Sequence, residues 1–115
     1  MVSSEHSGNW LVLDGRVLAT LEIATTRRDR RRGLLGRDGI DGALLLRPAK
    51  SVHTFGMRFP IDVAHLDGDG SVLRLTTMKP TRVGSFVLRS RSVIETEAGA
   101  FARWGVSEGD RLEIR

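Results

Sequence analysis

Residues 9–13 (NWLVL), the pair Asp14-Gly15 and residues 16–23 (RVLATLEI) decide the fold class of this chain. Asp-Gly between two apolar segments is a strong signal of a tight two-residue β-hairpin. In the second segment apolar side chains alternate with more polar ones, the apolar set being Val17, Ala19, Leu21 and Ile23. That period of two is typical of a strand with one buried face. The stretch therefore predicts a mainly β fold.

Short strands and turns continue along the chain. Residues 43–46 (ALLL) form an apolar run without alternation, which suits a strand buried on both faces. Further strands are expected at residues 61–66, 71–77, 92–96 and 111–115, with turns at 67–70 and 107–110. Thr25 and Thr26 as N-caps predict a short helix that reaches Leu35 and ends at Gly36, and residues 98–104 predict a second helix.

This succession of short strands favours a compact β-sandwich, jelly-roll-like in type, or a partly open barrel with one or two short helices. The 115 residues suit a single domain, with the first eight expected to be flexible. No cysteine is present, which excludes a disulfide scaffold, a thiolate metal site and a cysteine nucleophile. The first residues lack a basic and apolar leader, and no apolar run approaches the length of a membrane span. We therefore expect a cytoplasmic protein, of bacterial type, without a membrane partner.

The positive charge is concentrated in one place. Residues 27–32, which are five arginines and one aspartate, account for the whole formal net charge of +4. These cations, Arg27, Arg28, Arg30, Arg31 and Arg32, are a candidate binding site for phosphate groups or another anionic partner, including nucleic acid. No aromatic residues that could stack on bases are interleaved with them, so a solvated helix face is the alternative.

Four stretches together resemble a known family. They are Arg32-Gly33-Leu34-Leu35-Gly36-Arg37, then Phe55-Gly56-Met57 with Pro60-Ile61-Asp62, then residues 93–99 (VIETEAG), and residues 105–110 (GVSEGD). In this order and over residues 23–114 they resemble the small prokaryotic family called domain of unknown function 192. The resemblance implies a compact, jelly-roll-like β domain and no established activity. Gly56 stands where the family commonly has Trp, and Arg58-Phe59 replaces its Asn-Thr pair.

The segment of residues 52–62 carries the most chemistry. It places an imidazole, a hydroxyl, a guanidinium, two aromatic rings and a carboxylate just before a strand. Gly56 and Pro60 would give the loop a fixed shape, which a small-ligand pocket requires. The alternation of Phe55, Met57 and Phe59 also fits the inward face of an ordinary strand.

Two carboxylates stand in apolar strands, where a charge is costly unless it is paired. Asp62 precedes an apolar run and Glu95 follows one, so each is a candidate for acid–base work or for a structural anchor. The candidate ligand-binding residues are Arg37, His53, Met57, Arg58, Asp62 and Glu95.

Three functions remain open for these residues. We favour a non-enzymatic binding module for a small polar ligand or a loop of a protein partner, with Arg37 and Arg58 meeting anionic groups. The second is a small enzyme in which His53 or Asp62 acts as a general base. The third is nucleic-acid or anion binding through the five arginines. The spacing of the histidines fits no metal motif, and no nucleotide-binding motif is present, so neither a metal nor a cofactor is expected.

Overall fold

The strands form one sheet of seven, in the spatial order β5-β4-β6-β3-β2-β1-β7. The computed structural model describes residues 8–115, so the expected flexibility of the first eight residues falls, apart from Gly8, outside its range. The strands are β1 (Asn9–Leu13), β2 (Arg16–Ala24), β3 (Ala43–Leu46), β4 (Ile61–Leu66), β5 (Val72–Met78), β6 (Ser92–Glu97) and β7 (Leu112–Ile114). The two helices are α1 (Arg27–Arg32) and α2 (Ala100–Trp104).

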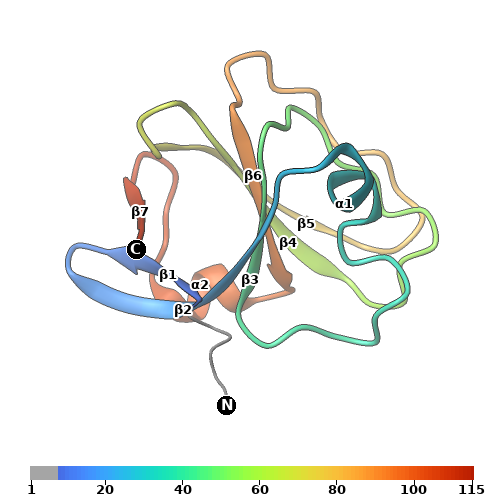
Figure 1. Ribbon diagram of the computed structural model, residues 1–115, viewed down its shortest axis with the longest axis horizontal. Helices are drawn as coiled ribbons and strands as arrows, with labels where there is room; N and C mark the ends of the chain where they lie inside the picture. The colour runs from blue at the N-terminus through green and yellow to red at the C-terminus, as the bar shows by residue number, and fades with distance from the viewer. Residues whose placement is uncertain (1–7) are drawn as a thin grey trace.

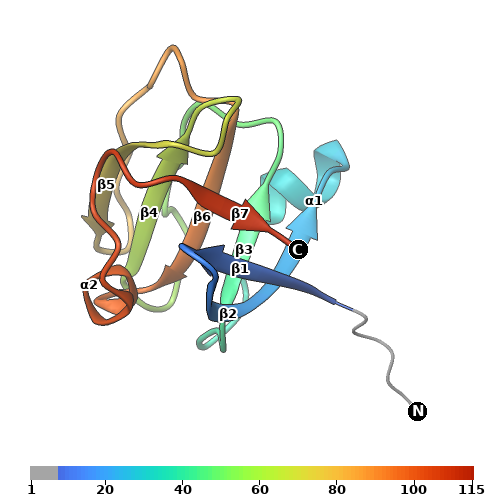
Figure 2. The ribbon, with the colours of Figure 1, turned by 90° about the vertical axis from the view of Figure 1, so that its left-hand side faces the viewer.

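The sheet curls into a half-barrel, as Figures 1 and 2 show from two sides. Its two ends approach each other where Ser71, before β5, forms a bridge with Arg111, before β7. There the backbone N–H of Leu112 donates to the carbonyl of Gly70 at 2.9 Å. The expectation of a mainly β fold is confirmed, and of the two architectures expected, the structure adopts the partly open barrel.

The Asp14-Gly15 turn forms as its sequence predicts. Asp14 has a φ of 51° and Gly15 a φ of 77°, and both positive values belong to the hairpin turn that matches strand twist. The turn joins Leu13 to Arg16, which face each other in the β1–β2 ladder. The first hairpin is therefore determined locally.

The one parallel pair within residues 8–115 joins β2 to β3, with Leu21 beside Ala43 and Ala24 beside Leu46. Parallel neighbours require a crossover connection. Residues 25–42 make this crossover, and they carry α1 with its arginines. The basic segment is thus part of a connection that the sheet topology demands.

Both faces of the central strands are buried, and Figure 1 shows α2 and α1 on opposite sides of β3 and β6. On the concave side, Leu45, Ala64 and Ile94 pack with Phe101 of α2. On the other side, Leu44, Val63 and Val93 pack with Leu34, Val52 and Met57 from the loops around α1, and we call this cluster the outer core. The fully buried ALLL strand at residues 43–46 agrees with its expected burial on both faces.

Both helices are shorter than expected. We expected the first helix to reach Leu35, but α1 ends at Arg32, and Gly33 donates its N–H to the carbonyl of Asp29 at 2.9 Å. Gly33 has a φ of 49° and a ψ of −127°, a conformation that ends the helix and disfavours other residues. At α2 the left-handed Gly99, with a φ of 93°, places the start at Ala100 rather than at residue 98.

Candidate functional site

Helix α1 presents its arginines to solvent without packing against the sheet. Thr26 caps it, with its side-chain oxygen accepting the N–H of Asp29 at 3.1 Å, and no residue of the helix is buried. The anchor comes directly afterwards, because Leu34 is 1% exposed and packs in the outer core. Among residues 8–115, none of the five arginines at 27–32 forms an ion pair.

A pocket of about 340 Å³ lies between α1 and the segment that follows β3. Its apolar walls come from the outer core, namely Leu34, Leu46, Val52 and Met57. Its cationic residues are Arg27, Arg30, Arg31, Arg32 and Lys50, with the imidazole of His53 beside them. We call this space the arginine pocket. An apolar floor with a few convergent polar groups is the usual form of a small-ligand site.

The one carboxylate of the arginine pocket is Glu95, near the end of β6. It lies between Leu44 of β3 and Val63 of β4 in the ladders, so it points to the same face as the outer core. Glu95 is only 4% exposed, and its Oε1 atom is the one buried side-chain polar atom of residues 8–115 without a hydrogen-bond partner. A buried oxygen of this kind is costly unless something binds to it.

Burial raises the pKa of Glu95 to about 7, from its ordinary value of 4.5. A hydrogen bond from the backbone of Leu34 and the charge of Arg37 both lower this pKa, but they offset only part of the rise that burial causes. Near neutral pH this carboxyl group therefore exists in both forms, one that donates a hydrogen bond and one that only accepts.

Gly33 brings the backbone of the α1 connection close to this carboxyl group. A Cβ atom at this position would lie 3.0 Å from Oε1 of Glu95. Only a glycine allows such an approach together with its backbone angles. The arginine segment and the carboxylate, which are far apart in sequence, are therefore joined through Gly33.

The structure brings together three of the six residues expected at a ligand site. His53, Met57 and Glu95 all line the arginine pocket. Arg37 lies next to it, in a second hollow that shares Arg32 and Gly33. There its guanidinium binds both carboxylate oxygens of Glu22 at 2.9 Å, which raises the pKa of Arg37 and lowers that of Glu22.

Arg58 and Asp62 lie elsewhere. Arg58 is exposed and pairs with Asp38 at 3.0 Å. Asp62 is buried on the opposite face of the sheet, because it is aligned with Thr96 rather than with Glu95. The two strand carboxylates therefore do not share a site.

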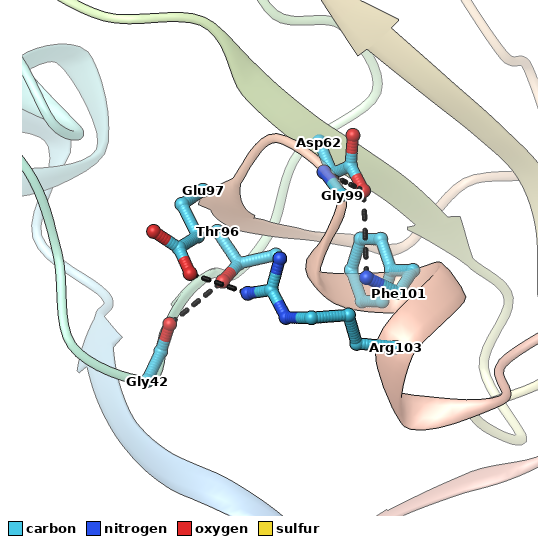
Figure 3. Close-up of polar contacts among 7 residues, drawn as sticks. All are labelled: Gly42, Asp62, Thr96, Glu97, Gly99, Phe101 and Arg103. Atoms are coloured by element: carbon cyan, nitrogen blue, oxygen red, sulfur yellow. Dashed lines mark hydrogen bonds and ion pairs between the residues drawn. The ribbon is translucent and has the colours of Figure 1, made fainter.

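Asp62 holds the segment that leads into α2, as Figure 3 shows. One of its oxygens accepts the hydroxyl of Thr77 at 2.7 Å. The other accepts the backbone N–H of Gly99 at 3.1 Å and that of Phe101 at 3.4 Å. With three donors on its carboxylate, Asp62 has the position of a structural anchor.

Four of the five arginines line the pocket, and Arg28 does not. The sequence identified the arginines and Glu95 separately, but it did not predict that they meet. Lys50 and Leu46 also line the pocket and were missed, because nothing in their local sequence distinguishes them from surface or core residues. The available signal was the glycine after the last arginine, since a glycine that ends a helix permits close contact.

His65 is a buried titratable residue that does not line the arginine pocket. His65 is 3% exposed, its Nδ1 lies 3.2 Å from the hydroxyl of Ser90, and burial lowers its pKa, with a smaller effect from Arg74. Within residues 8–115 no group of three His, Asp or Glu side chains could hold a metal ion. In the same part of the chain, no helix has the length and apolar character needed to cross a bilayer.

Comparison with known proteins gives a family and a fold. Residues 11–114 match the family DUF192, described as "Uncharacterized ACR". A protein of unknown function from Novosphingobium aromaticivorans is 17% identical, with a TM-score of 0.76 over 92% of this chain and 83% of that chain. A putative transcription regulator from Sinorhizobium meliloti is 26% identical, with a TM-score of 0.74 over 91% of this chain and 90% of the other. No curated protein matches the sequence significantly.

Proposed function

Because the chain belongs to the DUF192 family, whose description names no activity, we propose from the arginine pocket itself that the protein is a binding module for a small anionic ligand. The ligand would carry a phosphate or carboxylate group for the arginines and a hydroxyl or amine group for Glu95. The observation that carries the proposal is the unpartnered Oε1 of Glu95 in a pocket lined by cations.

The cationic side supplies affinity. Arg27, Arg30, Arg31 and Arg32 have no acidic partner within the described residues, so their charges are available to an anion. Hydrogen bonds between guanidinium and phosphate or carboxylate groups are short, directional and about twice as strong as neutral ones. Several of them at one pocket favour a compact anion over a neutral molecule.

Glu95 supplies selectivity. The Oε1 atom of Glu95 exposes almost no surface, so a ligand that reaches it must displace side chains that line the pocket. The arginine side chains of α1 are long and mostly exposed, so they can move aside. A ligand hydroxyl or amine would then satisfy the buried oxygen, and a ligand without that group would leave it unsatisfied. The apolar walls of Leu34 and Met57 would cover the carbon skeleton of the ligand.

An acid–base enzyme remains the second candidate, on one specific observation. The pocket contains His53 together with Glu95, whose pKa of about 7 suits proton transfer near neutral pH. The base would then be one of these two groups and not Asp62, which is held by three hydrogen bonds on the other face. A screen for turnover of bound ligands by the natural protein and by Glu95→Gln separates the two functions.

The name of the Sinorhizobium structure raises nucleic-acid binding through the same arginines. Helix α1 has six residues and no interleaved aromatic side chain, which is short for reading a groove and unsuited to stacking on bases. We therefore place the arginines at a small-molecule pocket rather than at a nucleic-acid interface.

The test is calorimetric titration with inorganic phosphate and with glycerol phosphate, which adds hydroxyl groups to the same anion. We expect glycerol phosphate to bind more tightly. Arg30→Gln with Arg31→Gln should weaken both probes at least about tenfold, since a hydrogen bond to a charged group contributes roughly 1.5–3 kcal/mol. Arg28→Gln is the matched control for the single substitution Arg31→Gln, because each removes one charge from the same helix and Arg28 does not line the pocket.

Glu95→Gln should reduce the preference for glycerol phosphate while leaving the affinity for inorganic phosphate similar. Equal losses from Arg28→Gln and from the pocket variants would show that only the general positive field matters, and the proposed pocket would be rejected. Binding of neither probe, nor of citrate as a carboxylate probe, would also contradict the proposal.

A further inference from the structure

Beside the arginine pocket, two loops pair along one side of the molecule. Residues 47–60 and 79–91 are joined by hydrogen bonds from Thr54 N to Arg82 O and from Gly84 N to Val52 O, both 2.8 Å long. Figure 1 shows them in green and in gold to orange, side by side at the end of the molecule where α1 lies. The hydroxyl of Thr54, which is fully buried, donates to the carbonyl of Lys79 at 2.6 Å. The loop pair therefore has a defined structure.

The loop pair exposes large apolar side chains. Val83 and Leu88 are each 73% exposed, Phe86 is 66% exposed and Phe55 is 48% exposed. The other exposed large apolar residues of the described chain are only Trp10 and Val17, in the first hairpin. Single exposed apolar residues are common, but four of the six exposed large apolar residues of the described chain lie on these two paired loops, which favours a partner there.

The loop pair also carries positive charge without negative charge. Residues 47–60 and 79–91 contain no Asp or Glu, and their seven cations are Arg47, Lys50, Arg58, Lys79, Arg82, Arg89 and Arg91. Within the described chain only Arg58 among these forms an ion pair, with Asp38. Asp67 and Asp69 line a hollow with Arg89 and Arg91, which offsets the charge at that end. The unbalanced charge is therefore nearest to Val83, at Lys79 and Arg82.

We propose that the loop pair binds the surface of an anionic lipid bilayer, with Val83, Phe86 and Leu88 inserted among the lipids. The lysine and arginine side chains around them would contact the lipid phosphates. Membrane-surface binding of this kind combines apolar insertion with attraction to anionic headgroups. It needs no spanning helix, so it departs from the sequence-based expectation of no membrane partner, which considered only spanning segments.

The exposed fractions favour a bilayer over a folded protein. A side chain that exposes about two-thirds or more of its surface contacts little of its own protein, so it projects outward instead of lining a groove. Val83 and Phe86 are of this kind, whereas Leu88, although 73% exposed, also lines the hollow that contains Asp67 and Asp69. Projecting apolar side chains require a partner that accepts them without a matched shape, and the acyl boundary of a bilayer does so. Of the three side chains proposed to insert, Val83 and Leu88 are aliphatic, which also makes base stacking a poor alternative.

Flotation with lipid vesicles tests this proposal. Vesicles of phosphatidylcholine containing about one-third phosphatidylglycerol should carry the protein upward in a density gradient, and vesicles of phosphatidylcholine alone should not. Binding should weaken as salt is added, since screening reduces the attraction between exposed charges. Phe86→Ser with Leu88→Ser should abolish flotation, and Lys79→Gln with Arg82→Gln should reduce it several-fold.

Trp10→Ser with Val17→Ser provides the matched control, since these residues are also exposed and apolar but lie in the first hairpin. This control should float like the natural protein, and circular dichroism should show that all variants are folded. The proposal is overturned if no flotation occurs with the anionic vesicles. It is also overturned if the Phe86 and Leu88 variant still floats, or if the control loses flotation equally.

Two other results would assign the surface to another class of partner. Binding of the natural protein to a duplex DNA probe with no flotation would assign it to nucleic acid. Binding to an acidic peptide with no flotation would assign it to a protein partner. The inference does not depend on the arginine pocket, so phosphate titration of the same variants, which should be unchanged, distinguishes its failure from failure of the proposed function.

Discussion

Gly33 and Glu95 meet so closely that a single added carbon would press on the carboxyl group, with 3.0 Å between a Cβ on Gly33 and Oε1 of Glu95. Gly33→Ala should therefore lower the free energy of unfolding by about 2–4 kcal/mol, through backbone strain and this contact together. It should also reduce the preference for glycerol phosphate over inorganic phosphate, because Glu95 must shift within the pocket. Chemical denaturation and calorimetric titration measure the two effects.

Gly36→Ala is the control for this substitution. Gly36 also has a positive φ, 82°, but a Cβ there meets no atom within 4 Å. Gly36→Ala should lower the free energy of unfolding by only about 1–2 kcal/mol, through backbone strain, and should leave phosphate binding intact. Equal effects of the two substitutions would show that the contact with Glu95 is unimportant.

The raised pKa of Glu95 predicts that stability depends on pH. A carboxyl group with a higher pKa in the folded chain favours folding when it is protonated. This contribution is fully present below the ordinary pKa of 4.5 and is lost as pH rises through about 7. The shift corresponds to roughly 3 kcal/mol, at 1.36 kcal/mol for each pKa unit.

Denaturation of Glu95→Gln at about pH 5 and about pH 8 measures this contribution, because the amide does not titrate. The fall in stability between the two pH values should be smaller in the variant than in the natural protein. Glu97→Gln, which changes an exposed carboxylate on the same strand, should keep the natural pH dependence. An unchanged pH dependence in Glu95→Gln would contradict the prediction.

His65 predicts the opposite dependence at lower pH. Burial, with a smaller effect from Arg74, lowers its pKa below the ordinary 6.5, so the folded chain favours the neutral ring. Its contribution is present above pH 6.5 and is lost as the pH falls through the lowered pKa. In the Glu95→Gln background, stability should therefore fall on acidification, and His65→Gln should remove most of that fall. If stability still falls on acidification to the same extent in the double variant, the fall belongs to another titratable group.

Asp62→Asn tests the anchor of α2. Both oxygens of the Asp62 carboxylate accept hydrogen bonds, one from Thr77 and the other from Gly99 and Phe101. Asparagine keeps one oxygen and replaces the other with an NH2 group, which cannot accept. The free energy of unfolding measured in urea should fall by about 2 kcal/mol, because a buried donor is left unsatisfied. Phosphate binding should not change, since Asp62 lies on the face away from the pocket.

Asp38→Asn, at an exposed ion pair, is the comparison, with an expected change below about 0.5 kcal/mol. Loss of phosphate binding in Asp62→Asn without loss of stability would return Asp62 to the functional site.

Local patterns account well for the strands. The alternation in residues 16–23, the Asp14-Gly15 pair and the apolar run at residues 43–46 each predict an element that the structure contains. These signals depend only on residues that are close in sequence, so they can be recognised without the structure. The end of α1 was wrong by three residues, because Gly33 and Gly36 are both suitable helix stops and the contact with Glu95 is not local.

The candidate site could be predicted only in part, for a reason of register. Asp62 and Glu95 look alike in sequence, each a carboxylate in an apolar strand. In the β4–β6 ladder Asp62 faces Thr96 and Val63 faces Glu95, so an offset of one residue sends the two carboxylates to opposite faces. That offset is set by long-range pairing, which periodicity within either strand does not contain.

The crossover between β2 and β3 has a consequence for how this fold can diversify. Parallel pairing requires some connection here, and residues 25–42 meet that requirement with no buried side chain from α1 itself. The register of the sheet therefore does not depend on the charges on α1. Relatives could exchange this basic connection for an acidic or neutral one, and so change the ligand, while every strand kept its partner.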